Sequence, residues 1–140
     1  MIVYLDTSAI LKRYFEESFS DDMLSKWNNS EAVVSSSVAY AETMATICRK
    51  KKETGLDNII IQKVMDTFKT EWNSFIRVEV TDELNKHMDK VLQKHFLRGF
   101  DAIHLASALI IYERVPQNFF FACFDQKLNQ AAQLEGMESF

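Results

Sequence analysis

The stretch MIVYLDTSAILKRYF, residues 1–15, decides how the rest of the sequence is interpreted. Ile2–Leu5 is an apolar run with the length and composition of a buried β-strand. Asp6 follows it directly, and a helix is expected from Ser8 to about Glu16. An acidic residue at such a junction is commonly an N-cap or a turn residue. Any further role for Asp6 depends on which other carboxylates the fold brings to the end of this strand.

The rest of the chain alternates apolar, strand-like runs with longer segments of helical periodicity. Further strands are expected at Ala32–Ser35, at Phe75–Val80, at Phe119–Phe124 and, as a short fifth strand, at residues 137–140. Further helices are expected at Ser20–Asn28, Val38–Thr54, Leu56–Trp72, residues 81–96, Phe100–Glu113 and residues 125–134. The run FFFACF is apolar throughout, as in a strand that is buried on both faces. This order predicts one α/β domain over residues 1–140, with a parallel sheet and helices on both of its faces.

The composition is that of a soluble globular protein, with 47% apolar and 26% charged residues. No apolar run approaches the roughly 20 residues that a bilayer requires, and the first segment is too short for a signal peptide. Cys48 and Cys123 have no metal-binding spacing, so we expect two buried free thiols and a cytoplasmic protein. The net charge of −4 excludes nucleic-acid binding by overall charge alone. Contact with a phosphodiester then needs a local basic patch or a bound cation.

Four acidic residues stand at positions where a parallel α/β fold binds its ligands. Asp6 and Asp125 follow the first and fourth expected strands, whose carboxyl ends form the ligand-binding edge of such a sheet. Glu42 lies early in a helix among small and apolar residues, and Asp101 starts a strongly apolar helix. Each of the four also fits an ordinary structural role, either as a helix cap or as a charge facing the positive end of a helix dipole.

Four segments of the sequence resemble a PIN domain, most closely the VapC-type ribonuclease toxins of prokaryotic type II toxin–antitoxin pairs. They are MIVYLDTSAILKRYF, VAYAETMATICRK, LRGFDAIHLASAL and FACFDQKLNQAAQLEG, and they span essentially the whole chain. The resemblance implies a three-layer α/β/α fold with a parallel sheet of four to five strands in the order 3-2-1-4-5. In that order the first and fourth strands are neighbours, so Asp6 and Asp125 flank the switch point. Such domains usually continue beyond Gly136 into a fuller last strand than this chain has.

The resemblance also implies an acidic site made of Asp6, Glu42, Asp101 and Asp125. Carboxylates placed together repel one another unless a cation compensates them, and ligands that are all oxygen suit Mg²⁺ or Mn²⁺. The implied activity is a metal-dependent endoribonuclease that leaves a 5′-phosphate and a 3′-hydroxyl. Asp6 and Asp101 are the expected direct ligands, while Glu42 and Asp125 hold a second metal or orient water. Ser8 supports the site through its hydroxyl or simply starts a helix.

Basic residues near these positions are candidates for contacts with the RNA backbone. Arg49 and Lys50 follow Glu42 on the same helix, and Lys12 and Arg13 follow Asp6. A solvated helix C-terminus equally explains the run at residues 49–52. His104 lies three residues after Asp101 and is expected to be a packed histidine rather than a general base or a metal ligand.

The two long helices expected around Gly55 carry more apolar residues than one buried stripe requires. These residues are Ile59, Ile60, Ile61, Val64 and Met65. The surplus suggests a homodimer or an antitoxin helix as a partner. A non-catalytic PIN-like module that only binds partners or dimerises is the alternative function. A phosphatase of the haloacid dehalogenase type fits less well, because it requires a second Asp where Ser8 stands.

Overall fold

The centre of the computed structural model, which describes residues 1–140, is a parallel sheet with the strand order β3-β2-β1-β4-β5. The strands are β1 (Ile2–Leu5), β2 (Ala32–Ser36), β3 (Ile76–Val78), β4 (Phe119–Ala122) and β5 (Glu138–Ser139). The predicted order is confirmed. The last segment does form a fifth strand, which pairs with β4 and is only two residues long.

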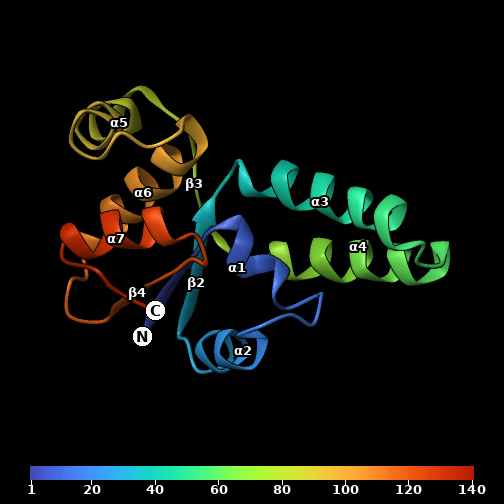
Figure 1. Cartoon of the computed structure of the whole chain (residues 1–140). Coiled ribbons are helices and arrows are strands. Elements are labelled where there is room, and N and C mark those ends of the chain that lie inside the picture. Colours follow the sequence, from blue (N-terminus) through green and yellow to red (C-terminus); the bar gives the residue numbers. More distant parts are fainter.

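Helices cover both faces of this sheet, and the fold therefore has the predicted three α/β/α layers (Figure 1). The helices are α1 (Thr7–Leu11), α2 (Ser20–Asn28), α3 (Ala39–Thr54), α4 (Asn58–Trp72), α5 (Asp82–His95), α6 (Gly99–Tyr112) and α7 (Gln126–Leu134). Side chains of α5, α6 and α7 share one hydrophobic cluster, and those of α1 to α4 share another. Tyr4 and Phe121 point into the first cluster while Val3 and Phe120 point into the second, because successive strand residues face opposite sides.

Helices α3 and α4 form the antiparallel hairpin that the sequence predicts, and in Figure 1 they extend away from the sheet. Gly55 ends α3 with a φ of 65°, a left-handed conformation that glycine adopts without steric cost. Asp57 caps α4 by accepting a hydrogen bond from the backbone of Ile59. Ile61 is buried, but 78% of Ile59 and 51% of Ile60 are exposed. The apolar surplus expected on this hairpin is therefore present on its surface.

Several sequence-based details are wrong. Strand β3 covers Ile76–Val78 rather than Phe75–Val80, and α4 begins at Asn58 rather than at Leu56. Helix α1 ends at Leu11 rather than near residue 16, and the chain continues in tighter turns, in which the backbone N–H groups of Lys12, Arg13 and Tyr14 bond to carbonyls three residues earlier. Strand β4 ends at Ala122 rather than at Phe124. Cys123 is buried as expected, but Cys48 is exposed.

None of the seven helices is both long enough and apolar enough to span a bilayer.

Candidate active site

Asp6 lies at the carboxyl end of β1 and caps α1. Its Oδ1 atom accepts hydrogen bonds from the backbone N–H of Ala9, at 2.9 Å, and from the hydroxyl of Ser8, at 2.6 Å. The Ser8 hydroxyl in turn accepts a hydrogen bond from the backbone N–H of Phe124, at 3.1 Å. Ser8 therefore joins the end of β1, where Asp6 lies, to the segment that follows β4.

Asp6 is almost completely buried, with 6% of its surface exposed. Burial raises the pKa of Asp6 above its ordinary value, because it removes water from the charged form. The positive charge of His104 and the hydrogen bonds from Ser8 and Ala9 act in the opposite direction without cancelling the effect. In this structure the ionised form of Asp6 is thus disfavoured relative to an Asp in water.

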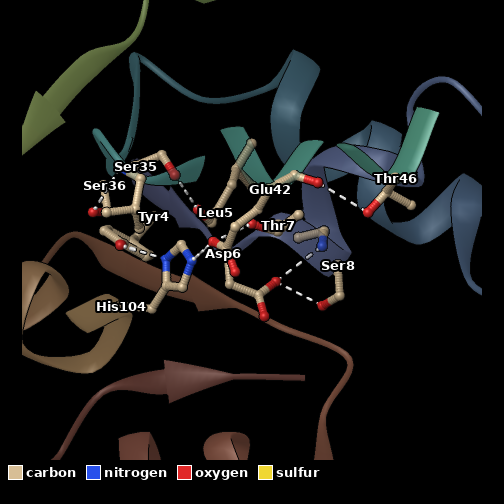
Figure 2. A network of polar contacts seen from close by, with 12 residues as sticks. Tyr4, Leu5, Asp6, Thr7, Ser8, Ser35, Ser36, Glu42, Thr46 and His104 are labelled. Atoms are coloured by element: carbon tan, nitrogen blue, oxygen red, sulfur yellow. Dashed lines mark hydrogen bonds and ion pairs between the residues drawn. The ribbon is translucent and has the colours of Figure 1, made fainter. Parts of the chain in front are cut away.

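Glu42 lies in the first turn of α3, and its side chain is held by two donors (Figure 2). Its Oε1 atom accepts from the Thr7 hydroxyl and from His104 Nε2, both at 2.8 Å. Burial by itself raises the pKa of Glu42. The hydrogen bond and the charge of His104, together with the hydrogen bond from Thr7, have a larger opposite effect, so this pKa lies below its ordinary value. Glu42 is thus held as a carboxylate whose Oε2 atom accepts no hydrogen bond from the protein.

His104 connects Glu42 to the core of the protein. Its Nδ1 atom lies 2.8 Å from the hydroxyl of the fully buried Tyr4, and the His104 ring itself is 3% exposed (Figure 2). A carboxylate only accepts hydrogen bonds, so His104 donates from Nε2 to Glu42, while its Nδ1 has the Tyr4 hydroxyl as its partner. The expectation of a packed histidine is confirmed. Its bond to Glu42 was not predicted, although the spacing of three residues from Asp101 placed His104 on the right face of α6.

Asp125 and Asp101 complete the set of acids at this edge of the sheet. Asp125 is exposed and caps α7 by accepting from the backbone N–H of Leu128, at 2.8 Å. Asp101 lies half-buried in the first turn of α6 and accepts no hydrogen bond from the protein. Burial raises the pKa of Asp101, and the negative charges of Asp125 and Asp6, with a smaller effect of Glu42, raise it further. The other three acids therefore lie within electrostatic range of Asp101.

The chemical character of these four side chains suits a hard divalent cation. All four side chains offer oxygen, and their mutual repulsion at Asp101 is what a cation would relieve. The structure confirms that Asp6 and Asp125 cap helices. In each case the capping hydrogen bond is accepted by Oδ1, so the second carboxylate oxygen is left for another function. As the side chains stand, no group of three or more His, Cys, Asp and Glu residues is spaced to hold a metal ion.

The four candidate RNA-binding residues have different surroundings. Lys12 and Lys50 both pair with Glu17, at 3.1 and 3.5 Å. Arg13 pairs with Glu71 of α4 at 2.6 Å. Arg49 is exposed, forms no ion pair, and lines a cavity that also includes Glu42. Of the four, Arg49 alone shares a cavity with a residue of the acidic site.

Comparison with known proteins identifies the family. The family model described as PIN domain matches residues 3–133. The chain belongs to the PIN domain family. Two curated relatives from Mycobacterium tuberculosis, Ribonuclease VapC45 of strain CDC 1551 and Ribonuclease VapC49 of strain H37Rv, are each 29% identical to this PIN domain over 135 residues. Each alignment covers 96% of this chain and 92% of the relative, and the resemblance seen in the sequence is thereby confirmed.

Solved structures share the fold at lower sequence identity. FitAcB from Neisseria gonorrhoeae superposes with a TM-score of 0.69 at 13% identity, over 100% of this PIN domain and 96% of that chain. VapBC2 from Rickettsia felis, bound to a promoter DNA fragment, gives 0.63 at 13% identity, over 100% and 98%. VapC20 from M. tuberculosis, described as a sarcin-ricin loop cleaving toxin, gives 0.64 at 16% identity, over 94% and 95%.

Proposed function

We propose that this PIN domain is an endoribonuclease that hydrolyses RNA phosphodiester bonds with Mg²⁺ or Mn²⁺ and serves as the toxin of a toxin–antitoxin pair. The observation that carries the proposal is the PIN domain match over residues 3–133, with four carboxylates in electrostatic contact at the carboxyl edge of the sheet. The relatives named Ribonuclease VapC45 and VapC49 support ribonuclease rather than another nuclease activity.

In this proposal the carboxylates divide the work between binding a metal and orienting water. Asp6 and Asp101 would hold the cation, and Glu42 and Asp125 would hold a second metal or orient the attacking water. The bound metal supplies charge neutralisation at the phosphate and a lower pKa for the attacking water. Ser8 and the N–H of Ala9 orient Asp6, while Thr7 and His104 orient Glu42. Hydrolysis in line with the leaving 3′-oxygen gives a 5′-phosphate and a 3′-hydroxyl.

The partners in this proposal are RNA, a second copy of the chain and an antitoxin protein. The exposed Ile59 and Ile60 of the α3–α4 hairpin offer an apolar surface for a protein partner. A toxin that cleaves RNA acts where RNA is translated, so the proposed location is the cytoplasm. The alternative function is a non-catalytic PIN-like module, which would bind a partner through the same surface without catalysis by the four acids.

The test is the cleavage of a mixed pool of RNA by the purified protein with Mg²⁺, with Mn²⁺ and with EDTA. Asp6→Asn and Asp101→Asn remove candidate ligands at nearly constant shape, and Asp89→Asn changes an exposed acid of α5 as a matched control. We expect metal-dependent cleavage by the parent and by Asp89→Asn, and none by the other two variants. Equal activity in all four would indicate a contaminating nuclease. No cleavage, together with no calorimetric binding of Mn²⁺, would support the non-catalytic module.

A further inference from the structure

A cavity of about 510 Å³ opens beside Glu42, between α3 and the start of α6. Thr7 and Glu42 of the acidic site line it. The exposed residues Ala41, Ala45 and Arg49, which follow one another at intervals of four along α3, line it as well. Phe100, the residue before Asp101, also lines the cavity. Its volume lies within the range of small-ligand sites in proteins, about 300–1,000 Å³.

Phe100 is the unusual member of this cavity. It lies next to Asp101 in the chain, and 58% of its surface is exposed, so the hydrophobic core does not account for it. Phe96, at the end of α5, is 78% exposed but does not line the cavity. Of these two exposed phenylalanines, Phe100 shares a cavity with the acidic site and Phe96 does not.

The lining of the cavity matches the chemistry of an unpaired nucleotide. Single-stranded RNA is recognised largely by stacking its bases on aromatic side chains and by contacts of cations with its backbone. Phe100 offers an exposed aromatic surface, the alanines of α3 leave room for a planar group, and Arg49 offers a guanidinium without a carboxylate partner. A base held here has its own phosphate within reach of the acids, because Glu42 is part of the same cavity.

The other large cavity near the acids has a different electrostatic character. Its volume is about 580 Å³, and it is lined by Phe19, Phe124 and Phe140 together with Asp22. Beside it lies a smaller cavity whose lining includes four acids, Glu16, Glu17, Asp21 and Asp22. These negative charges repel a phosphodiester chain, whereas Arg49 attracts one.

We propose that the cavity between α3 and α6 is a nucleotide-binding subsite, in which Phe100 stacks on a base of the RNA strand and Arg49 contacts its phosphate. This inference rests on the proposed ribonuclease function and adds the place where the nucleotide next to the cleaved bond is bound. A protein side chain or a second copy of the chain is the competing occupant.

The experiment measures binding of a short fluorescein-labelled single-stranded RNA of mixed sequence by anisotropy. The Asp6→Asn variant serves as background, so that the strand is not cut. Adding Phe100→Ala is expected to weaken binding about 5- to 50-fold, as stacking of one base predicts, and Phe100→Trp is expected to bind within threefold of the background. Adding Phe96→Ala, which alters another exposed phenylalanine as a control, is expected to change binding less than twofold.

A salt series on the same background tests Arg49. Arg49→Ala is expected to make the negative slope of log affinity against log salt shallower by about 0.7, the value for one phosphate contact with a single strand. Lys51→Ala, an exposed control on the opposite side of α3, is expected to leave the slope unchanged. In the otherwise unaltered protein, Phe100→Ala is expected to raise KM for RNA cleavage while kcat stays within threefold and calorimetric Mn²⁺ binding is unchanged.

Two results overturn the subsite, in each case with cleavage by the parent intact. One is equal weakening by Phe100→Ala and Phe96→Ala, and the other is no weakening by Phe100→Ala. If this second result comes with an altered mass of Phe100→Ala in light scattering, the cavity is a protein contact. If the parent cleaves no RNA, the proposed function fails first and the subsite fails with it.

Discussion

Glu42 and Asp101, two acids of the same site, differ in how far the protein stabilises their negative charge. Glu42 accepts hydrogen bonds from Thr7 and His104, and its pKa lies below the ordinary value despite burial. Asp101 receives no hydrogen bond from the protein, faces three other carboxylates, and has a raised pKa. One acid is already fixed in its charged form by the fold, while the other holds charge that the protein does not compensate. This difference indicates that the fold prepares Glu42 for orientation and leaves Asp101 for a cation.

The largest effect expected from this contrast follows removal of the uncompensated charge. Asp101→Asn is expected to lower RNA cleavage by more than about 100-fold, since it removes a candidate metal ligand. It is also expected to raise the free energy of unfolding of the metal-free protein at pH 7, by a few tenths to about 1 kcal/mol, because repulsion with Asp6 and Asp125 disappears. Cleavage assays and urea denaturation measure the two effects. A loss of both activity and stability would show that Asp101 is a structural residue.

A second prediction tests whether His104 acts on Glu42 or only fills the core. The amide of Gln in place of His104 reaches the position of Nε2 and still donates to Glu42, whereas that of Asn reaches only the position of Nδ1, next to Tyr4. Both variants are expected to cost about 2–3 kcal/mol of stability, because each loses the ring and one buried hydrogen bond. Only His104→Asn is expected to weaken calorimetric Mn²⁺ binding strongly, by about 10- to 100-fold. Equal Mn²⁺ affinity in the two variants would assign His104 a packing role alone.

The contrast between the acids also gives stability a definite dependence on pH. Asp6 and Asp101 have raised pKa values, so above the ordinary Asp value of 3.8 the folded protein keeps protons that the unfolded chain has lost. Their contribution to stability is complete below that value and is lost as the pH rises through the raised pKa values. Glu42 acts oppositely, and its contribution is lost as the pH falls below its ordinary value of 4.5.

We therefore expect the melting temperature of the metal-free protein to fall, as the pH rises from 4 to 7, by more than that of Asp101→Asn. Saturating Mn²⁺ is expected to stabilise the parent more at pH 7 than at pH 5, because protons compete with the metal for the same oxygens. Differential scanning calorimetry of the two proteins, with and without Mn²⁺, provides the comparison. Parallel pH profiles of the metal-free proteins would contradict the raised pKa of Asp101.

The smallest effect is expected for Tyr4, which contacts His104 and is linked to Glu42 only through it. Tyr4→Phe removes the hydroxyl that contacts His104 Nδ1 but leaves the bond between His104 and Glu42 in place. The expected cost is about 1 kcal/mol of stability, with Mn²⁺ affinity and cleavage within threefold of the parent. Tyr14→Phe, which loses a hydroxyl bound to Glu71 away from the acids, is the matched control. A tenfold loss of Mn²⁺ affinity in Tyr4→Phe alone would show that Tyr4 also controls the orientation of Glu42.

The strands, the hairpin and the helix caps follow from local sequence patterns. The run FFFACF and Gly55 each determine a feature through residues close in the chain: the buried strand β4, which ends two residues earlier than predicted, and the end of α3. The strand order and the grouping of the four acids came from the resemblance to PIN domains, because no periodicity encodes which strands are neighbours. The contact of His104 with Glu42, 62 residues apart, had no such signal. The early end of α1, at Leu11, was also not predicted.

The most direct test of the metal site is a crystal structure of the protein soaked with MnCl₂, with an anomalous difference map recorded near the manganese edge. We predict a peak bound by carboxylate oxygens of Asp6 and Asp101, with Glu42 Oε1 still bonded to Thr7 and His104. The same peak should be absent from Asp101→Asn crystals soaked in parallel. A fully soaked parent crystal without a peak at these acids would contradict a metal-dependent site at the carboxyl edge of the sheet.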